Sequence, residues 1–218
     1  STVRANPTYG QSIVSYTGTS AANATVGHGL NSSPEMMIIK NRDASENWIV
    51  AHTGHTTYGS YINQLNLTAA ETDYANNFND TAPTNSVFTI GGASSPDRST
   101  QYNGDKYIAY CFHSVTGYSK FGSYTGTGSS GKTITTGFKP AFVMVKKSSG
   151  TDSWLIMDST RNPVNPVTNT LAANSSGAEN ADTGGIPTNF TDTGFTLTGT
   201  GGDYNASGAT YIYMAFAD

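Results

Sequence analysis

Hydrophobic positions along this chain fall in short runs that are rich in β-branched and aromatic residues and are separated by Gly, Ser, Asn and Pro. Such runs predict β-strands joined by turns, because no segment keeps a sustained helical period. The stretch 63–74 is the one place where we expect a helical turn or two. The predicted strands are 12–17, 24–30, 35–40, 48–53, 86–90 and 106–113, followed by 121–125, 133–138, 141–146, 154–157, 194–197 and 210–217.

The second half of the chain repeats the first. SYTGTSAANATVGHGL around Ser15 matches SYTGTGSSGKTITTGF around Ser123, and YIAYCFH from Tyr107 matches YIYMAFA from Tyr211. Matched segments with small changes of spacing indicate one fold that was duplicated, with insertions confined to loops. We therefore predict an all-β protein of two tandem antiparallel β-sandwich modules, each jelly-roll-like and about 100 residues long. The predicted parts are an N-terminal arm or linker (1–11), module 1 (12–116) and module 2 (117–218).

Several runs are apolar at every position and should form inner strands. Met36–Ile39 and Ile108–Phe112 are of this kind, and Trp48 and Trp154 occupy matched places in the two halves. Matched aromatic residues within inner strands more often anchor a core than bind a ligand. The predicted core anchors are Trp48, Trp154, Ile108, Phe112, Ile212 and Phe216.

Composition narrows the range of partners. Only 12% of the residues are charged and the net charge is −4, with no basic stripe, so we expect no nucleic-acid partner. No apolar run approaches the length of a membrane span, so we expect no membrane insertion. The single cysteine, Cys111, is matched by Ala215, which predicts a small buried packing site and a protein assembled in a reducing compartment.

Candidate chemistry is sparse. The four glutamates occupy no matched or paired positions, so the sequence predicts no catalytic residues. His52 and His55 have a spacing that can seat a metal, but Asp158 and Arg161 replace them in the second half, which favours ordinary loop histidines. We expect no metal ligands and no cofactor; a Ca²⁺ ion in an Asp/Asn-rich loop is the one exception compatible with the sequence.

Tyrosines in the predicted loops are the better candidates for recognition of a surface or a glycan, since exposed aromatic rings can stack on sugar rings. These candidates are Tyr58, Tyr61, Tyr74, Tyr102 and Tyr204.

Several segments resemble a known group of proteins. GYSKFGSYTGTGSSG, TGFKPAFVMVKKSSGTDSWLIMD, STRNP and SGATYIYMAFA are similar to a duplicated module in structural proteins of marine tailed bacteriophages. SIVSYTGTSAANATVGHGL and MMIIKNRDASENWIVAH are similar to the first half of the same pair. The resemblance covers nearly the whole chain and implies a tail-fibre, appendage or capsid-surface protein. It transfers no functional residues.

These observations together predict a non-enzymatic component of a virion surface: a fibre, an appendage or a capsid decoration that attaches to the host. Its expected partners are copies of itself in a symmetric homo-oligomer, other virion proteins and host-surface glycans. Residues before about position 12 would lead in from a further domain, and the arm 1–11 would lie against a neighbouring copy or another virion protein. The alternatives are a secreted pair of carbohydrate-binding modules, a subunit of a non-viral extracellular filament, and a hydrolase. Exposed tryptophans in a groove would favour the first of these.

Overall fold

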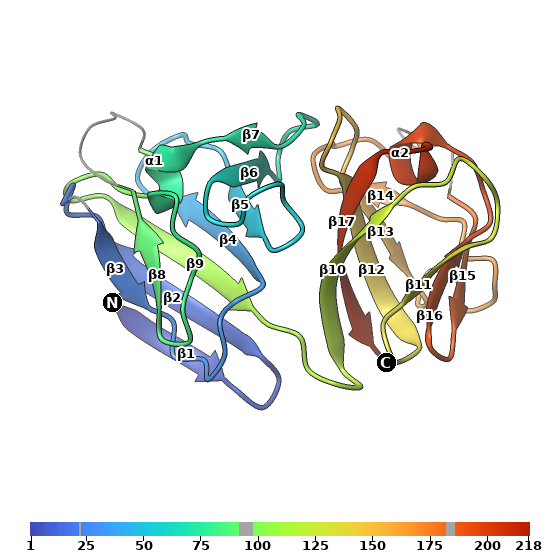
Figure 1. Cartoon of the computed structure of the whole chain (residues 1–218), viewed down its shortest axis with the longest axis horizontal. Helices are drawn as coiled ribbons and strands as arrows, with labels where there is room; N and C mark the ends of the chain where they lie inside the picture. Colours follow the sequence, from blue (N-terminus) through green and yellow to red (C-terminus); the bar gives the residue numbers. More distant parts are fainter. Residues whose placement is uncertain (22, 92–97, 182–185) are drawn as a thin grey trace. The chain divides into compact units, whose positions relative to one another are not determined.

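The computed structural model describes residues 1–218 apart from residue 22 and residues 92–97 and 182–185. The chain divides into two compact units (Figure 1): unit 1 contains Ser1–Leu65 and Glu71–Ser114, and unit 2 contains Asn66–Ala70 and Val115–Asp218. The regular secondary structure of both units is almost entirely antiparallel β-sheet. The predicted all-β antiparallel class is therefore confirmed.

Unit 1 has a large sheet with the strand order β1-β2-β9-β4-β5-β6-β7 and a small sheet in which β3 pairs with β8. One short helix, α1, precedes β8. The bounds are β1 Thr2–Asn6, β2 Gln11–Thr17, β3 Ala24–Gly27, β4 Met36–Asn41, β5 Ile49–His52, β6 Tyr61–Gln64, β7 Thr72–Asp73, α1 Ala75–Phe78, β8 Val87–Ile90 and β9 Lys106–Phe112.

Unit 2 has a large sheet with the order β10-β17-β12-β13-β14 and a small sheet with the order β11-β16-β15. Its short helix, α2, lies between the small sheet and the last strand. The bounds are β10 Ser119–Thr125, β11 Lys132–Thr135, β12 Pro140–Lys147, β13 Leu155–Asp158, β14 Leu171–Ala172, β15 Thr188–Thr191, β16 Gly194–Leu197, α2 Gly202–Asn205 and β17 Thr210–Ala217.

The two large sheets share one plan. In unit 1, β2 and β4 flank the closing strand β9, and β5 and β6 follow β4 outward. In unit 2, β10 and β12 flank the closing strand β17, and β13 and β14 follow β12. This is the order that the repeated sequence segments lead one to expect from a duplicated fold.

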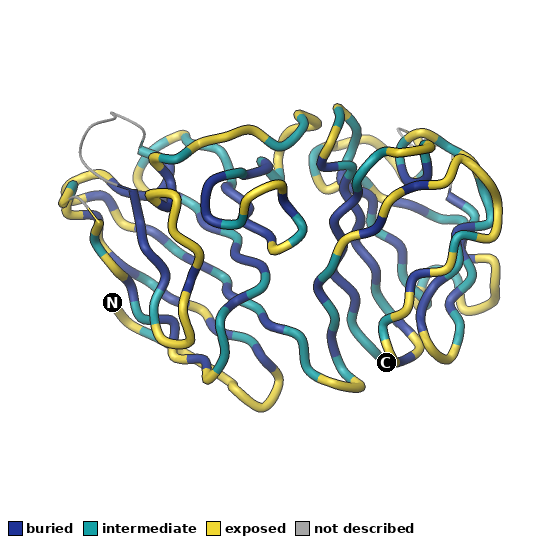
Figure 2. The backbone as a smooth tube through the Cα atoms, viewed as in Figure 1, coloured by how far each residue is buried: buried dark blue, intermediate teal, exposed yellow. Residues whose placement is uncertain are grey.

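The hydrophobic core of each unit lies between its large and small sheets. Successive strand residues point to opposite faces, so every second residue of a core strand enters it. In β9 the core residues are Tyr107, Ala109 and Cys111, and in β17 they are Tyr211, Tyr213 and Ala215. Figure 2 shows buried segments along these strands and exposed loops between them.

A stacked tyrosine pair joins the closing strand of each large sheet to a neighbouring strand, β9 to β2 in unit 1 and β17 to β10 in unit 2. Tyr16 and Tyr107 stack with ring centroids 5.0 Å apart and 11° between planes, and Tyr124 and Tyr211 stack with the same values. Tyr16 Oη donates to Thr100 O at 2.9 Å, and Tyr124 Oη donates to Tyr204 O at 2.7 Å. Each pair therefore combines ring packing with a hydrogen bond that ties a loop to the sheet.

A lysine at the end of the central strand closes the adjoining loop in each unit. Lys40 Nζ donates to Asn41 O at 2.6 Å and to Ala44 O at 3.3 Å. Lys146 Nζ donates to Lys147 O at 2.6 Å and to Gly150 O at 3.1 Å. Lys146 is fully buried, and burial lowers the pKa of its amine to about 8.

Four of the six predicted core anchors are less buried than expected. Trp154 and Ile212 are buried, whereas Trp48, Ile108, Phe112 and Phe216 are half-buried. The reason for the three strand residues is the alternation of side chains: they lie on the face of the large sheet that points away from the small sheet. Trp48 and Trp154 each stand one residue before a strand, β5 and β13, so this position does not explain their different burial.

The first eleven residues and the helix also differ from expectation. Instead of a separate arm, Thr2–Asn6 forms β1, which pairs with β2 of the same chain from Thr2 opposite Ser15 to Asn6 opposite Gln11. The expected helical turns within 63–74 are absent; the nearest helix is α1. Among the described residues, no helix has the length and apolar character needed to cross a bilayer.

Candidate functional site

The five tyrosines proposed for surface recognition do not form one surface. Tyr74 and Tyr102 are exposed, by 43% and 40%, while Tyr58 and Tyr61 are half-buried. Tyr58 Oη donates to Pro34 O at 2.5 Å and its ring packs against the core of unit 1, so this residue holds a loop in place. The prediction is wrong for Tyr204, which is only 6% exposed and belongs to the core of unit 2.

Glycines explain why Tyr204 is buried although its loop looked exposed. A Cβ atom on Gly199 would collide with the Tyr204 hydroxyl, and a Cβ on Gly201 would lie 2.6 Å from the edge of the ring. The missing side chains therefore leave the space that the ring fills. A run of glycines and polar residues is typical of an exposed loop, so nothing in the sequence indicated that Tyr204 belongs to the core.

Tyr102 is part of a polar cluster on the surface of unit 1. The Arg98 guanidinium carbon lies 4.4 Å from the centroid of the Tyr102 ring, a cation–π distance. Arg98 also makes a two-pronged ion pair with Asp105, with Nε to Oδ2 at 2.9 Å and Nη2 to Oδ1 at 2.7 Å. Asn41 Nδ2 donates to the same Oδ2 at 2.9 Å. We call Arg98, Tyr102, Asp105 and Asn41 the Tyr102 platform.

The charges of the platform are fixed by these contacts. Hydrogen bonds from Arg98 and then from Asn41 lower the pKa of Asp105 below its usual value. The carboxylate therefore stays ionised and keeps the guanidinium plane in position near the ring.

Two loops hold the Tyr102 platform. Gln101 Nε2 donates to Thr19 Oγ1 at 3.2 Å and to Ala21 O at 3.2 Å, and Thr19 N donates to Gln101 Oε1 at 3.0 Å. A Cβ on Gly18 would collide with the backbone carbonyl of Tyr102, so only glycine allows the loops to meet this closely. The result is an exposed aromatic ring on a firmly anchored loop.

Sequence reasoning selected Tyr102 but missed its partners. Arg98 and Asp105 lie in a loop with no strand period, and their only signal is opposite charge seven residues apart. Unit 2 has a different residue at the position of Asn41: Lys147 follows the buried Lys146, whereas Asn41 follows Lys40 in unit 1. Lys147 Nζ pairs with Asp152 Oδ2 at 3.0 Å. The Tyr102 platform is thus a property of unit 1.

His52 and His55 make hydrogen bonds within and next to one turn. His52 Nδ1 accepts from Gly54 N at 2.9 Å, and His55 Nε2 lies 3.0 Å from Asn63 Oδ1. Both imidazole rings are buried. In unit 2 the matched Asp158 accepts from Arg161 N at 2.8 Å, so a different side chain caps the equivalent turn. The described residues contain no cluster of three or more His, Cys, Asp or Glu side chains that could hold a metal ion.

Other reactive residue types serve local structure. Cys111 is buried, and desolvation raises the pKa of its thiol to about 12, so it stays protonated at neutral pH. Glu35 Oε2 accepts from Ser114 N at 2.6 Å, and Glu179 Oε1 accepts from Arg161 Nη1 at 2.7 Å.

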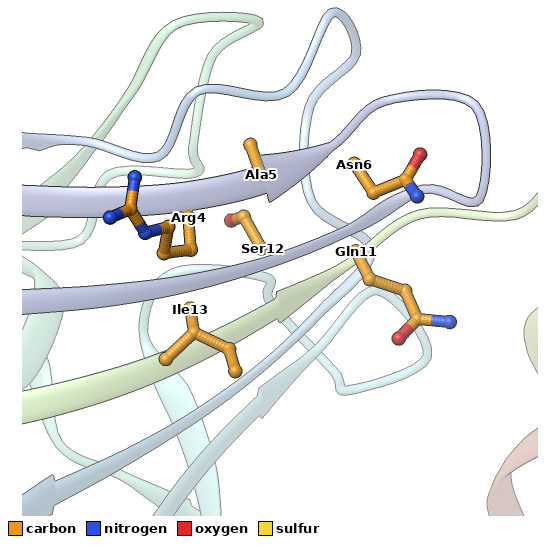
Figure 3. Close-up of a pocket in the computed structure, with 6 residues that line it drawn as sticks. All are labelled: Arg4, Ala5, Asn6, Gln11, Ser12 and Ile13. Carbon is orange, nitrogen blue, oxygen red and sulfur yellow. The ribbon is translucent and has the colours of Figure 1, made fainter.

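The hairpin of β1 and β2 carries a surface hollow of about 250 Å³. Figure 3 shows side chains from both strands around it, with the Arg4 guanidinium and the Gln11 amide on well-separated sides. Ile13 is 48% exposed and is paired across the hairpin with Arg4. The hollow is shallow and belongs to an edge strand, which suits contact with another protein better than enclosure of a small molecule. Its lining residues are Arg4, Ala5, Asn6, Gln11, Ser12 and Ile13.

A family model described as "Domain of unknown function (DUF7483)" matches residues 1–218. The chain belongs to this family. No curated protein and no solved structure matches the chain. The family description carries no activity, so the functional argument rests on the residues themselves.

Proposed function

We propose that the chain is a non-enzymatic structural protein of a tailed-phage virion surface, as a fibre, an appendage or a capsid decoration. The resemblance of its repeated segments to phage structural modules supplies the virion assignment. The observation that carries the structural role is that the two units repeat two packing features, the stacked tyrosines and the lysines that close a loop, but not their polar surface groups. Repeated packing stabilises each unit in the same way, while the differing surfaces serve contact with other molecules.

In this proposal the Tyr102 platform contacts host-surface glycans. An exposed ring can stack on the apolar face of a sugar, and the neighbouring Arg98 and Asp105 can exchange hydrogen bonds with hydroxyl groups. The exposed Tyr102 ring also favours the second candidate function, a secreted pair of carbohydrate-binding modules. The tryptophans do not support that alternative, because Trp154 is buried and Trp48 is half-buried.

The virion assignment is tested by mass spectrometry of purified particles. We expect peptides from both units of the chain to co-purify with the major capsid or tail proteins at a constant ratio. Presence of the chain only in the culture medium, with none on particles, would reject the virion role and leave the secreted alternatives.

Glycan contact is tested separately on an array of bacterial surface polysaccharides. We expect Tyr102→Ala to weaken binding on the order of tenfold, since losing a stacked ring costs about 1.4 kcal/mol. Tyr74→Ala is the matched control, because Tyr74 is equally exposed but lies outside the Tyr102 platform. Equal loss in both variants would contradict the assignment.

A further inference from the structure

The two large sheets differ at one edge. In unit 1, β2 pairs with the closing strand β9 on one side and with β1 on the other. In unit 2, β10 has the place of β2: it pairs with the closing strand β17, and Tyr124 stacks on Tyr211 as Tyr16 stacks on Tyr107. In the part of the chain that the structure describes, no strand pairs with β10 on its other side.

The chain that precedes β10 reaches this edge at one residue only, where Val115 forms an isolated bridge with Ser119. In unit 1, β1 and β2 form a hairpin, with four residues between Asn6 and Gln11. Of residues 110–114, at the corresponding distance before β10, the first three belong to the end of β9, which is already paired with β2 and β4 in unit 1. A full strand at the edge of β10 beyond Ser119 must therefore come from elsewhere.

A matched pair of glycines marks the position that β1 occupies. Gly29 and Gly137 both have positive φ, of 73° and 89°, and each precedes a buried residue, Leu30 or Phe138. A Cβ on Gly29 would lie 2.8 Å from Val3 Cγ1 and 3.1 Å from Ala5 Cβ, so β1 covers this glycine. At Gly137, among the described residues, nothing lies within 4 Å of the same point. The position that β1 side chains fill in unit 1 is open in unit 2.

Strand β1 is suited to pair with this second edge. Its side chains are exposed except for the half-buried Val3, so its attachment relies mainly on the backbone ladder. Its partner β2 ends within the sequence SYTGT that begins at Ser15, and β10 ends within the same sequence SYTGT that begins at Ser123. Backbone pairing is largely independent of side chains, and the local sequence at the two edges is alike.

We propose that strand β1 of one copy leaves its own β2 and pairs with the open edge of β10, beyond Ser119, in a second copy of this chain. By analogy with unit 1, the strand pairs antiparallel to β10, with Thr2 opposite Ser123 and Val3 opposite Gly122. Val3 then covers Gly137 as it covers Gly29 in its own unit. Each copy gives one strand and receives one at a different surface, so the contact is head-to-tail and builds a ring or a filament. The inference does not depend on a virion role.

A cross-linking experiment tests the register. Thr2→Cys and Ser123→Cys are made in separate full-length chains; both positions are exposed, whereas the native Cys111 is buried. The two variants are mixed at high concentration under mild oxidation. We expect disulfide-linked pairs containing one copy of each variant, well above the yield when Thr133→Cys, an exposed position on β11, replaces Ser123→Cys. Equal yields would overturn the proposal.

A second variant distinguishes strand exchange from other contacts. Thr2→Cys with Ser15→Cys in one chain locks β1 to its own β2, since these residues are partners in the hairpin. By analytical ultracentrifugation, the wild-type chain should form larger species as concentration rises, and the locked chain should remain monomeric. Association that survives the lock, or a wild-type chain that stays monomeric throughout, would contradict the proposal.

Discussion

The stacked tyrosine pairs give the sharpest stability prediction, because each unit carries one. Tyr124→Phe in unit 2 and Tyr16→Phe in unit 1 keep the ring stack and remove one buried hydroxyl. The lost bonds are those to Tyr204 O at 2.7 Å and to Thr100 O at 2.9 Å. Burial raises the pKa of both phenols well above 10, so both hydroxyls are donors at any ordinary pH.

The expected cost is about 1–2 kcal/mol for each variant. A lost hydrogen bond costs about 1 kcal/mol, and the carbonyl left without its donor adds a similar amount. The assay is urea unfolding followed by tryptophan fluorescence. Trp48 reports on unit 1 and Trp154 on unit 2, and a Trp→Phe change at one position isolates the other.

Each tyrosine variant should lower the unfolding midpoint of its own unit at an unchanged slope. Tyr74→Phe, at an exposed position, is the control and should change the free energy of unfolding by less than about 0.5 kcal/mol. A loss no larger than the control in both units would refute the idea that the repeated hydroxyls tie loops to the sheets.

Three further predictions concern packing and charge. Trp154→Ala should cost about 3–5 kcal/mol, measured by urea unfolding with a non-tryptophan probe, and Trp48→Ala should cost less because it is half-buried; equal costs would contradict the burial difference. The free energy of unfolding should rise by about 1–2 kcal/mol between pH 8 and about pH 9.5. Lys146 has a pKa of about 8 in the folded protein against 10.5 in the unfolded chain. In this pH range unfolding therefore takes up a proton at Lys146, and it becomes less favourable as the pH rises. Lys146→Met should remove this rise, and an unchanged rise in that variant would assign it to another group. Gly18→Ala should destabilise unit 1, because its methyl group collides with the Tyr102 backbone. Circular dichroism melting measures the loss, with Gly104→Ala as the control in which φ is positive but the added methyl meets nothing. A melting temperature no lower for Gly18→Ala than for Gly104→Ala would contradict the collision.

Most strands could be predicted from sequence because the apolar runs are short and bounded by turn residues. The strands that the prediction missed are β1, β6, β7, β14 and β15. The match of Tyr16–Tyr107 with Tyr124–Tyr211 also follows from the repeated segments. The burial of individual residues was less predictable. Ile108 and Phe112 lie in a run that is apolar at every position, and only the position of the small sheet decides which face of that run is the core.

The Tyr102 platform and the edge of β10 depend on contacts that sequence does not encode locally. Arg98 meets Asp105 because the loop folds back, and Gly18 permits that approach only through the absence of a side chain. The pairing of β1 with β2 was missed because five polar and small residues give no strong strand period. Tyr204 was misplaced because its glycine-rich neighbours make room for the ring instead of exposing it.

Electron cryomicroscopy of native particles, with the chain located in the reconstruction, tests the central claim most directly. We expect density for both β-rich units in many symmetry-related copies on the outer surface of a fibre, an appendage or the capsid. Absence of the units from every surface feature, in particles whose remaining proteins account for all of the density, would contradict the proposed structural role.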